Sequence, residues 1–76
     1  MNQIRRAHVR GLASRLEQLS EEVRAVLEAE RDSLDATPEN LQSSDRYAQS
    51  EEAAENLESA ASSLEDALDS LTAVLD

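Results

Sequence analysis

The chain contains no cysteine, phenylalanine, tryptophan or lysine, and it has a single histidine. Without cysteine it can form neither a disulfide nor a thiolate metal site, and one histidine excludes a histidine metal cluster. The lack of Phe and Trp removes the side chains that bury the most area. A chain of 76 residues forms one small domain with little core. We therefore expect stability to come from Leu, Val and Ala on long helices, and from association with another chain.

Long apolar runs are also missing. No stretch approaches the ~20 apolar residues of a membrane-spanning helix, so we expect no contact with a membrane. The first sixteen residues hold four arginines and no acid, a composition found in transit peptides. Helical apolar spacing continues through them, however, and there is no secretory apolar region. We expect a cytoplasmic protein.

Negative charge is concentrated in the second half of the chain. Residues 1–34 hold six arginines and six acids, whereas residues 35–76 hold eleven acids and only Arg46. The entire net charge of −10 therefore arises in residues 35–76. A strongly acidic half favours a basic partner and disfavours direct contact with nucleic acid.

Residues 47–75 carry a seven-residue repeat, the pattern of a helix that packs on other helices. With heptad positions lettered a to g, Leu57, Leu64 and Leu71 take position d. Position a holds Tyr47, Ala54, Ala61, Leu68 and Leu75, and position g holds Ala53, Ala60, Ala67 and Val74. Three apolar positions in seven make a stripe wide enough for a bundle core.

Residues 4–34 also have helical spacing, but it is less regular. Leu12, Leu16, Leu19, Val23 and Val26 are separated by four and three residues in turn, and the stripe then shifts by one position at residues 27 and 34. Such a shift resembles a stutter, which locally unwinds a supercoil. Glycine costs about 1 kcal/mol relative to alanine inside a helix. At Gly11 we therefore expect either a close approach of another helix or a helix that begins after it.

The segment 35–47, DATPENLQSSDRY, interrupts both repeats and contains the only proline. Thr37 is a suitable N-cap and Pro38 suits the first helical position, so the first helix should end near residues 34–36. Ser43 or Ser44 can cap the second helix. Two helices of similar length with a short connector favour an antiparallel hairpin.

The sequence thus predicts an all-α fold in one domain, residues 1–76, with helices at about 3–34 and 44–75 and a connector at 35–44. The N-terminal arginines would lie beside the aspartates that end the second helix. A hairpin leaves apolar surface exposed, so we expect a homodimer that forms a four-helix bundle. The residues expected to mediate self-association are Leu12, Leu16, Leu19, Val23, Leu27, Leu57, Leu64, Leu68, Leu71 and Leu75.

The connector sequence PENLQ (38–42), followed by Arg46-Tyr47 and then by "LE" heptads, resembles a family of small acidic helical proteins from bacteriophages and prophages. The resemblance covers roughly residues 27–68 and depends on the connector, because acidic coiled coils share the heptads. It implies a phage or prophage origin, a bacterial host cytoplasm and a helical hairpin. The family has no established activity, so the resemblance implies no catalytic residues.

No pattern in the sequence predicts catalysis or metal binding. A nucleophile needs a neighbouring base, yet His8 lies in an arginine-rich segment, and Glu51 and Glu52 point outward from adjacent positions. There is no acidic calcium loop and no Glu-x-x-His pair. We expect no enzyme, no cofactor, no metal and no small-molecule substrate. The RRAHVR segment (5–10) could contact phosphates, but the chain is acidic and nearly free of aromatics, so direct nucleic-acid binding is not expected.

Two surface features are candidates for binding another protein. One is the acidic face of the second helix, which either serves solubility or imitates the phosphates of DNA. The other is the connector, which is either a capped turn or a recognition loop. The acidic candidates are Glu51, Glu52, Glu55, Glu58, Glu65, Asp66 and Asp69, and the connector candidates are Asn40, Leu41, Gln42, Arg46 and Tyr47.

From these features we predict a helical protein–protein interaction module that self-associates and acts as an adaptor or regulator. The alternative is an inhibitor that mimics DNA and blocks a nucleic-acid-binding defence enzyme, such as a restriction or CRISPR effector.

Overall fold

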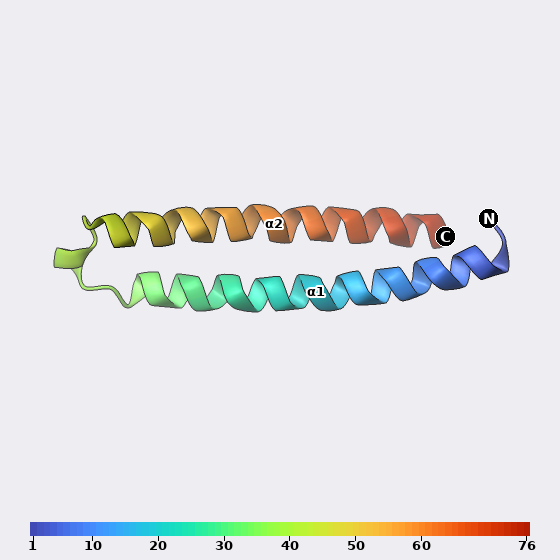
Figure 1. The fold of residues 1–76 in the computed structure, drawn as a ribbon, viewed down its shortest axis with the longest axis horizontal. Helices are drawn as coiled ribbons and strands as arrows, with labels where there is room; N and C mark the ends of the chain where they lie inside the picture. The colour runs from blue at the N-terminus through green and yellow to red at the C-terminus, as the bar shows by residue number, and fades with distance from the viewer.

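The computed structural model describes residues 1–76 as two long antiparallel helices joined by a short connector (Figure 1). Helix α1 spans Gln3–Asp35 and helix α2 spans Asp45–Leu75, with a single 3-10 turn, η1, at Glu39–Leu41 between them. The two termini lie at one end of the hairpin and the connector lies at the other (Figure 1). The prediction of an all-α helical hairpin is confirmed, and both helices begin and end within one residue of their expected limits.

Side-chain caps fix where each helix begins. The Asn2 side chain accepts a hydrogen bond from the backbone N–H of Arg5 at 2.8 Å, so α1 begins well before Gly11. Ser44, rather than Ser43, caps α2, because its hydroxyl oxygen accepts from the backbone N–H of Tyr47 at 3.1 Å. Both caps satisfy amide groups that have no partner within the first turn of a helix.

Thr37 has a different role from the expected N-cap. Its hydroxyl donates to the carbonyl oxygen of Ser33 at 2.9 Å and so satisfies a free acceptor at the end of α1. Gln42 closes the connector from the other side, where its side-chain amide donates to the carbonyl of Thr37 at 3.2 Å. The connector is therefore held by its own side chains against the C-terminal end of α1.

The core is a single seam between the two helices. On α1 the seam is an unbroken four-three repeat of buried or half-buried residues: Val9, Ala13, Leu16, Ser20, Val23, Leu27, Glu30 and Leu34. On α2 it is Tyr47, Ser50, Ala54, Leu57, Ala61, Leu64, Leu68, Leu71 and Leu75. Only four residues in the chain are buried outright, namely Leu27, Ala54, Ala61 and Ser20. Three of these four are small, which suits two helices that lie close together.

The first helix has no stutter, which differs from the expectation. The spacing of apolar residues predicts that Leu12, Leu19 and Val26 share one stripe with Leu16 and Val23, yet these three side chains are 36%, 52% and 55% exposed. The seam instead passes through Ala13 and Ser20. Because these side chains are small, a search for large apolar residues does not find the regular four-three repeat. Gly11 serves no close approach either, since a methyl group added there would have no neighbour within 4 Å.

The hairpin is long and thin, with extents of 59 × 15 × 14 Å. Its radius of gyration is 17.3 Å, against about 11 Å for a compact domain of this length. Its accessible surface is 5657 Å², roughly 1,000 Å² more than the ~4,600 Å² of a compact monomer of the same mass. The isolated hairpin therefore exposes more surface than a chain of this size usually does.

Candidate interaction surfaces

Ion pairs between the helices identify one long side of the hairpin, which we call the charged side. Arg24 contacts Glu65 at 2.9 Å and Glu58 at 3.2 Å, and Arg31 contacts Glu58 at 2.7 Å. When both helices are lettered so that Leu27 and Ala54 take position a, all four of these residues take position e. The e positions of the two antiparallel helices thus meet on this side.

Hydrogen bonding shifts the acid–base properties of one of these pairs. The hydrogen bond from Arg24 lowers the pKa of Glu65 below its ordinary value. The same bond to Glu65, joined by the charge of Glu58, raises the pKa of Arg24. These side chains are between 37% and 48% exposed, and exposed pairs contribute little to stability. They mark the level at which α1 lies against α2.

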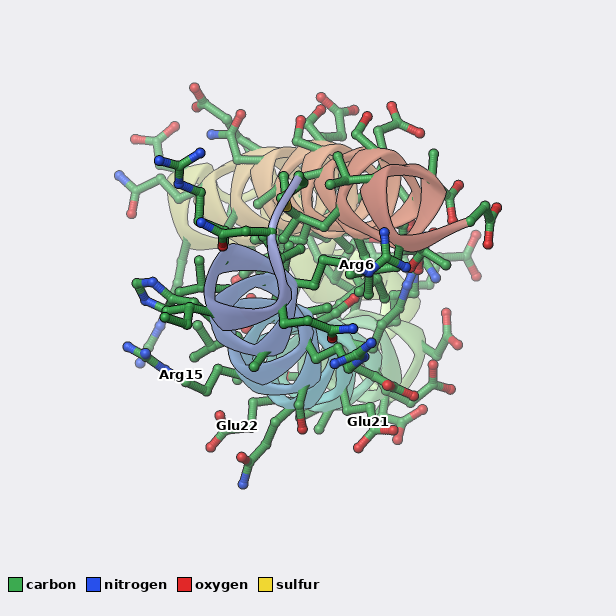
Figure 2. The ribbon with its side chains drawn as sticks, turned by 90° about the vertical axis from the view of Figure 1, so that its right-hand side faces the viewer. Arg6, Arg15, Glu21 and Glu22 are labelled. Carbon is green, nitrogen blue, oxygen red and sulfur yellow. The ribbon has the colours of Figure 1, made fainter.

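The N-terminal arginines do not form the expected pairs with the last aspartates of α2. The three ion pairs of the structure all involve Arg24 or Arg31. Arg6 instead donates a hydrogen bond to the backbone carbonyl of Leu75, at the negative end of α2. In the view along the hairpin, Arg6 lies beside the end of α2 (Figure 2). Helix-end attraction therefore replaces side-chain pairing at this end.

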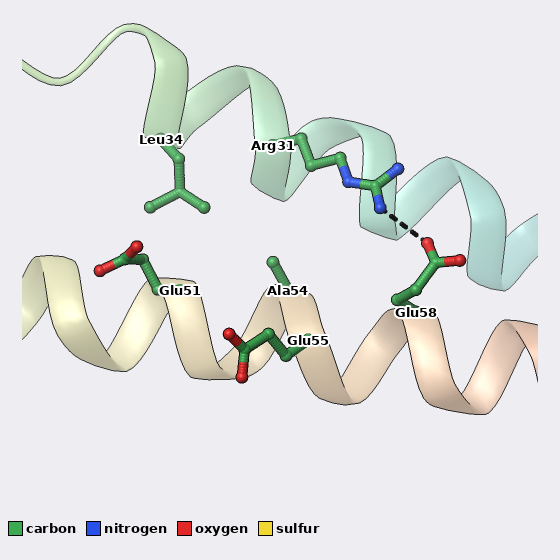
Figure 3. Close-up of a pocket in the computed structure, with 6 residues that line it drawn as sticks. All are labelled: Arg31, Leu34, Glu51, Ala54, Glu55 and Glu58. Atoms are coloured by element: carbon green, nitrogen blue, oxygen red, sulfur yellow. Dashed lines mark hydrogen bonds and ion pairs between the residues drawn. The ribbon is translucent and has the colours of Figure 1, made fainter.

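A shallow pocket of about 360 Å³ lies toward the connector on the charged side. Leu34 and Ala54 point between the helices, while the Arg31–Glu58 pair closes one end (Figure 3). Glu51 and Glu55 complete the lining. The pocket combines an apolar floor with an acidic rim.

The predicted acidic column divides into two groups. Glu58 and Glu65 are used in ion pairs with α1. The others have no ion-pair partner and project from the outer face of α2 or from its edge; they are Glu51, Glu52, Glu55, Asp66 and Asp69. Only this second group is free to meet a basic partner.

The connector candidates are partly brought together. Leu41, Arg46 and Tyr47 line one pocket of about 370 Å³ with side chains from the end of α1. Tyr47 is half-buried at position a, whereas Leu41 is 51% exposed. Asn40 does not line the pocket, and Gln42 is engaged with the backbone of Thr37. The structure thus assembles three of the five residues at the connector end.

The side opposite the ion pairs is apolar, and we call it the apolar side. It consists of the g positions within 12–26 of α1 and 53–74 of α2, which in this antiparallel pair lie together on the face away from the e positions; the g positions nearer the helix ends hold Arg5, Ser33 and Arg46. Seven exposed residues form the apolar side: Leu12, Leu19 and Val26 on α1, and Ala53, Ala60, Ala67 and Val74 on α2. Large side chains on α1 therefore lie beside a row of mostly small ones on α2.

Acidic residues are excluded from this side of α2, whose single charged residue at position g is Arg46 beside the connector. All acidic residues of α2 lie at positions e, f or b, which face the charged side or the outside. Position c, next to g, holds only uncharged polar residues: Gln49, Asn56, Ser63 and Ser70. On α1 the neighbouring c positions include Arg15 and Glu22, which project to the opposite side from Arg6 and Glu21 (Figure 2).

Most residues expected to mediate self-association are used within the hairpin itself. Leu16, Val23, Leu27, Leu57, Leu64, Leu68, Leu71 and Leu75 are buried or half-buried in the seam. Leu12 and Leu19 are the two that remain exposed on the apolar side. Sequence reasoning missed Val26 and the alanines at position g as residues of the apolar side. The seven-residue interval between Leu12, Leu19 and Val26 does indicate that these three lie on one face of the helix.

Neither helix combines the length and apolar character of a membrane span, and no group of three His, Asp or Glu side chains is placed to hold a metal ion. Comparison with models of known protein families, with curated proteins and with solved structures finds no match to the chain. Any assignment of function must therefore come from the surfaces described above.

Proposed function

We propose that this chain is a non-enzymatic helical interaction module that self-associates through its apolar side and acts as an adaptor or regulator. The observation that carries the proposal is the segregation of exposed residues. Apolar and small residues occupy the side opposite the ion pairs, and α2 places none of its acids there. A helix pair that functioned alone would have no reason to keep the acids of α2 away from one exposed side.

The exposed area supports the same proposal. A stable protein–protein interface buries about 800 Å² on each partner. The hairpin exposes roughly 1,000 Å² beyond a compact monomer of its mass, so covering one long side would remove the excess. A second hairpin of the same shape supplies a side of matching length, which gives a four-helix bundle.

Sedimentation equilibrium of a matched pair of variants tests this proposal. Leu19→Glu places a charge at the centre of the apolar side, and Gln18→Glu places the same charge on the neighbouring outer position f. We expect the wild type and Gln18→Glu to have twice the monomer mass of 8.3 kDa, and Leu19→Glu to be monomeric. A dimeric Leu19→Glu, or a monomeric wild type at tens of micromolar, would overturn the proposal.

The phage or prophage origin, and with it a bacterial cytoplasm, remains a prediction based on the connector residues. Under that origin the dimer would present its acidic outer faces and its connectors to proteins of the host or of the virus. The pocket at Leu41, Arg46 and Tyr47 is the place where such a partner would find apolar, cationic and aromatic groups together.

A second candidate function, that of a DNA-mimic inhibitor, is favoured by the unpaired acids of α2. Glu51, Glu52 and Glu55 form one such group near the connector. A mimic would inhibit DNA cleavage by a restriction or CRISPR enzyme at low salt, and inhibition would fall steeply as salt rises. Replacing these three residues by glutamine should abolish inhibition while leaving self-association intact. Inhibition that persists in this variant would count against the mimic.

A further inference from the structure

We infer that the occupant of the apolar side is a second copy turned end for end, so that the two connectors lie at opposite ends of the bundle. This inference rests on the proposed self-association and adds its orientation. Two arrangements keep the apolar sides face to face with two-fold symmetry. In one, both connectors lie at the same end and α1 packs on α2 of the partner; in the other, the connectors are far apart and each helix packs on its own counterpart.

Charge along the length of the hairpin distinguishes these two arrangements. The connector half, residues 20–63, holds three arginines and twelve acids, a net charge of −9. The open half, residues 1–19 with 64–76, holds four arginines and five acids, a net charge of −1. Placing the connectors together would set −9 against −9. The end-for-end arrangement sets each −9 half against a nearly neutral one, which lowers the repulsion.

The apolar side has the internal symmetry that this arrangement requires. Its α1 column is centred on Leu19, and its α2 column is centred between Ala60 and Ala67. The contacts of Arg24 with Glu58 and Glu65 show which residues of α1 and α2 lie side by side along the hairpin. Counted from these contacts, the centres of the two columns lie within about one helical turn of each other along the hairpin axis. A single two-fold axis can therefore pass through both, which places Leu19 against Leu19 of the partner subunit.

Two charged residues at the edge of the apolar side complement each other under the same axis. Arg15 and Glu22 take successive c positions, four residues before Leu19 and three after it, and project to the same side of α1 (Figure 2). Turning the second copy end for end brings Arg15 opposite the partner's Glu22, and Glu22 opposite the partner's Arg15. With the connectors together, Arg15 and Glu22 would instead face the uncharged c positions of α2, which offer no ion pair.

The distance between the two connectors decides the orientation. The chain has no cysteine, so Ser43→Cys gives one spin label per copy at an exposed connector position. From the level of Leu19, α1 runs about 24 Å to its end before the connector begins, so end-for-end copies place the labels roughly 50–60 Å apart. Pulsed electron resonance should show this distance on the labelled dimer. With both connectors at one end the labels would be separated only by the width of the bundle, and the distance would fall below about 30 Å.

The two proposals fail in distinguishable ways. A dimeric mass with the short distance overturns the orientation and leaves self-association standing. A monomeric mass for the labelled chain and for the wild type overturns both. A charge exchange gives an independent check: Arg15→Glu should weaken the dimer, and Arg15→Glu combined with Glu22→Arg should restore it, because the two-fold axis then recreates both pairs. An unchanged dissociation constant in Arg15→Glu would contradict the end-for-end pairing.

Discussion

Replacing Leu27 by alanine removes the largest fully buried side chain of the hairpin. Leu27 is 1% exposed, and the seam around it is built from small residues, with Ala54 at 9% and Ala61 at 0% exposure. Small neighbours have few rotamers with which to fill a cavity, so we expect a loss near the middle of the usual range for buried leucine, about 3–4 kcal/mol per chain. A domain of this length has a total stability of roughly 4–11 kcal/mol.

Urea unfolding followed by circular dichroism at one protein concentration measures this loss. Thermal unfolding gives a second measure. For a domain of 60–100 residues, each kcal/mol lowers the melting temperature by about 4–8 °C, so Leu27→Ala should melt at least ~12 °C below the wild type. Leu16→Ala is the matched control, since Leu16 lies in the same seam but is only half-buried and should lose less. A loss below about 1 kcal/mol for Leu27→Ala would refute the assignment of this seam as the core.

Three further predictions concern single positions. Gly11→Ala should stabilise the chain by up to about 1 kcal/mol in the same urea assay, because the glycine is helical and the added methyl group meets nothing; destabilisation would reveal an undescribed neighbour. Ser44→Ala should cost about 1 kcal/mol, since it removes the acceptor for the amide of Tyr47, while Ser43→Ala should have little effect. Glu65→Gln should destabilise at neutral pH only. The lowered pKa of Glu65 means that its charge contributes above its unfolded-state pKa, and that this contribution is lost as pH falls through the folded value. The stability difference between wild type and Glu65→Gln should therefore shrink as pH falls below the unfolded-state value of about 4.3 and vanish below the lower folded value, and a difference that does not shrink on acidification would contradict the role of the Arg24 hydrogen bond.

The hairpin itself was predictable because its signals are local. The heptads of residues 47–75, the proline at 38 and the serine cap each act over a few residues, and the structure places both helices where these signals indicated. The division of the apolar residues in α1 was harder to predict. Leu12, Leu16, Leu19, Val23 and Val26 form one plausible stripe by size alone.

Packing decides how that stripe is divided. The position of α2 buries Ala13 and Ser20 in preference to the larger Leu12 and Leu19, because a regular four-three repeat keeps the seam facing α2 along the whole helix. A count of large apolar residues cannot detect this. The ion pairs were missed for a related reason: they depend on the alignment of the two helices, which is fixed by the length and hydrogen bonds of the connector.

The connector residues illustrate the same limit. Asn40 and Gln42 looked equivalent in the sequence, since both are amides that can bond to free backbone groups. Only Gln42 does so, because η1 turns the chain in such a way that its side chain reaches the carbonyl of Thr37. The pocket formed by Leu41, Arg46 and Tyr47 likewise depends on that turn and could not be read from spacing.

The melting temperature measured as a function of protein concentration shows whether the hairpin self-associates. Unfolding of a dimer into two chains is opposed by mass action, which at a 100-fold higher concentration adds about 3 kcal/mol per dimer. With the usual unfolding entropy per residue for two chains of 76, the melting temperature should rise by roughly 9 °C across that range. We expect this rise for the wild type and no rise for Leu19→Glu. A wild-type melting temperature that stays constant over a 100-fold range in concentration would show that the hairpin folds alone and would overturn self-association.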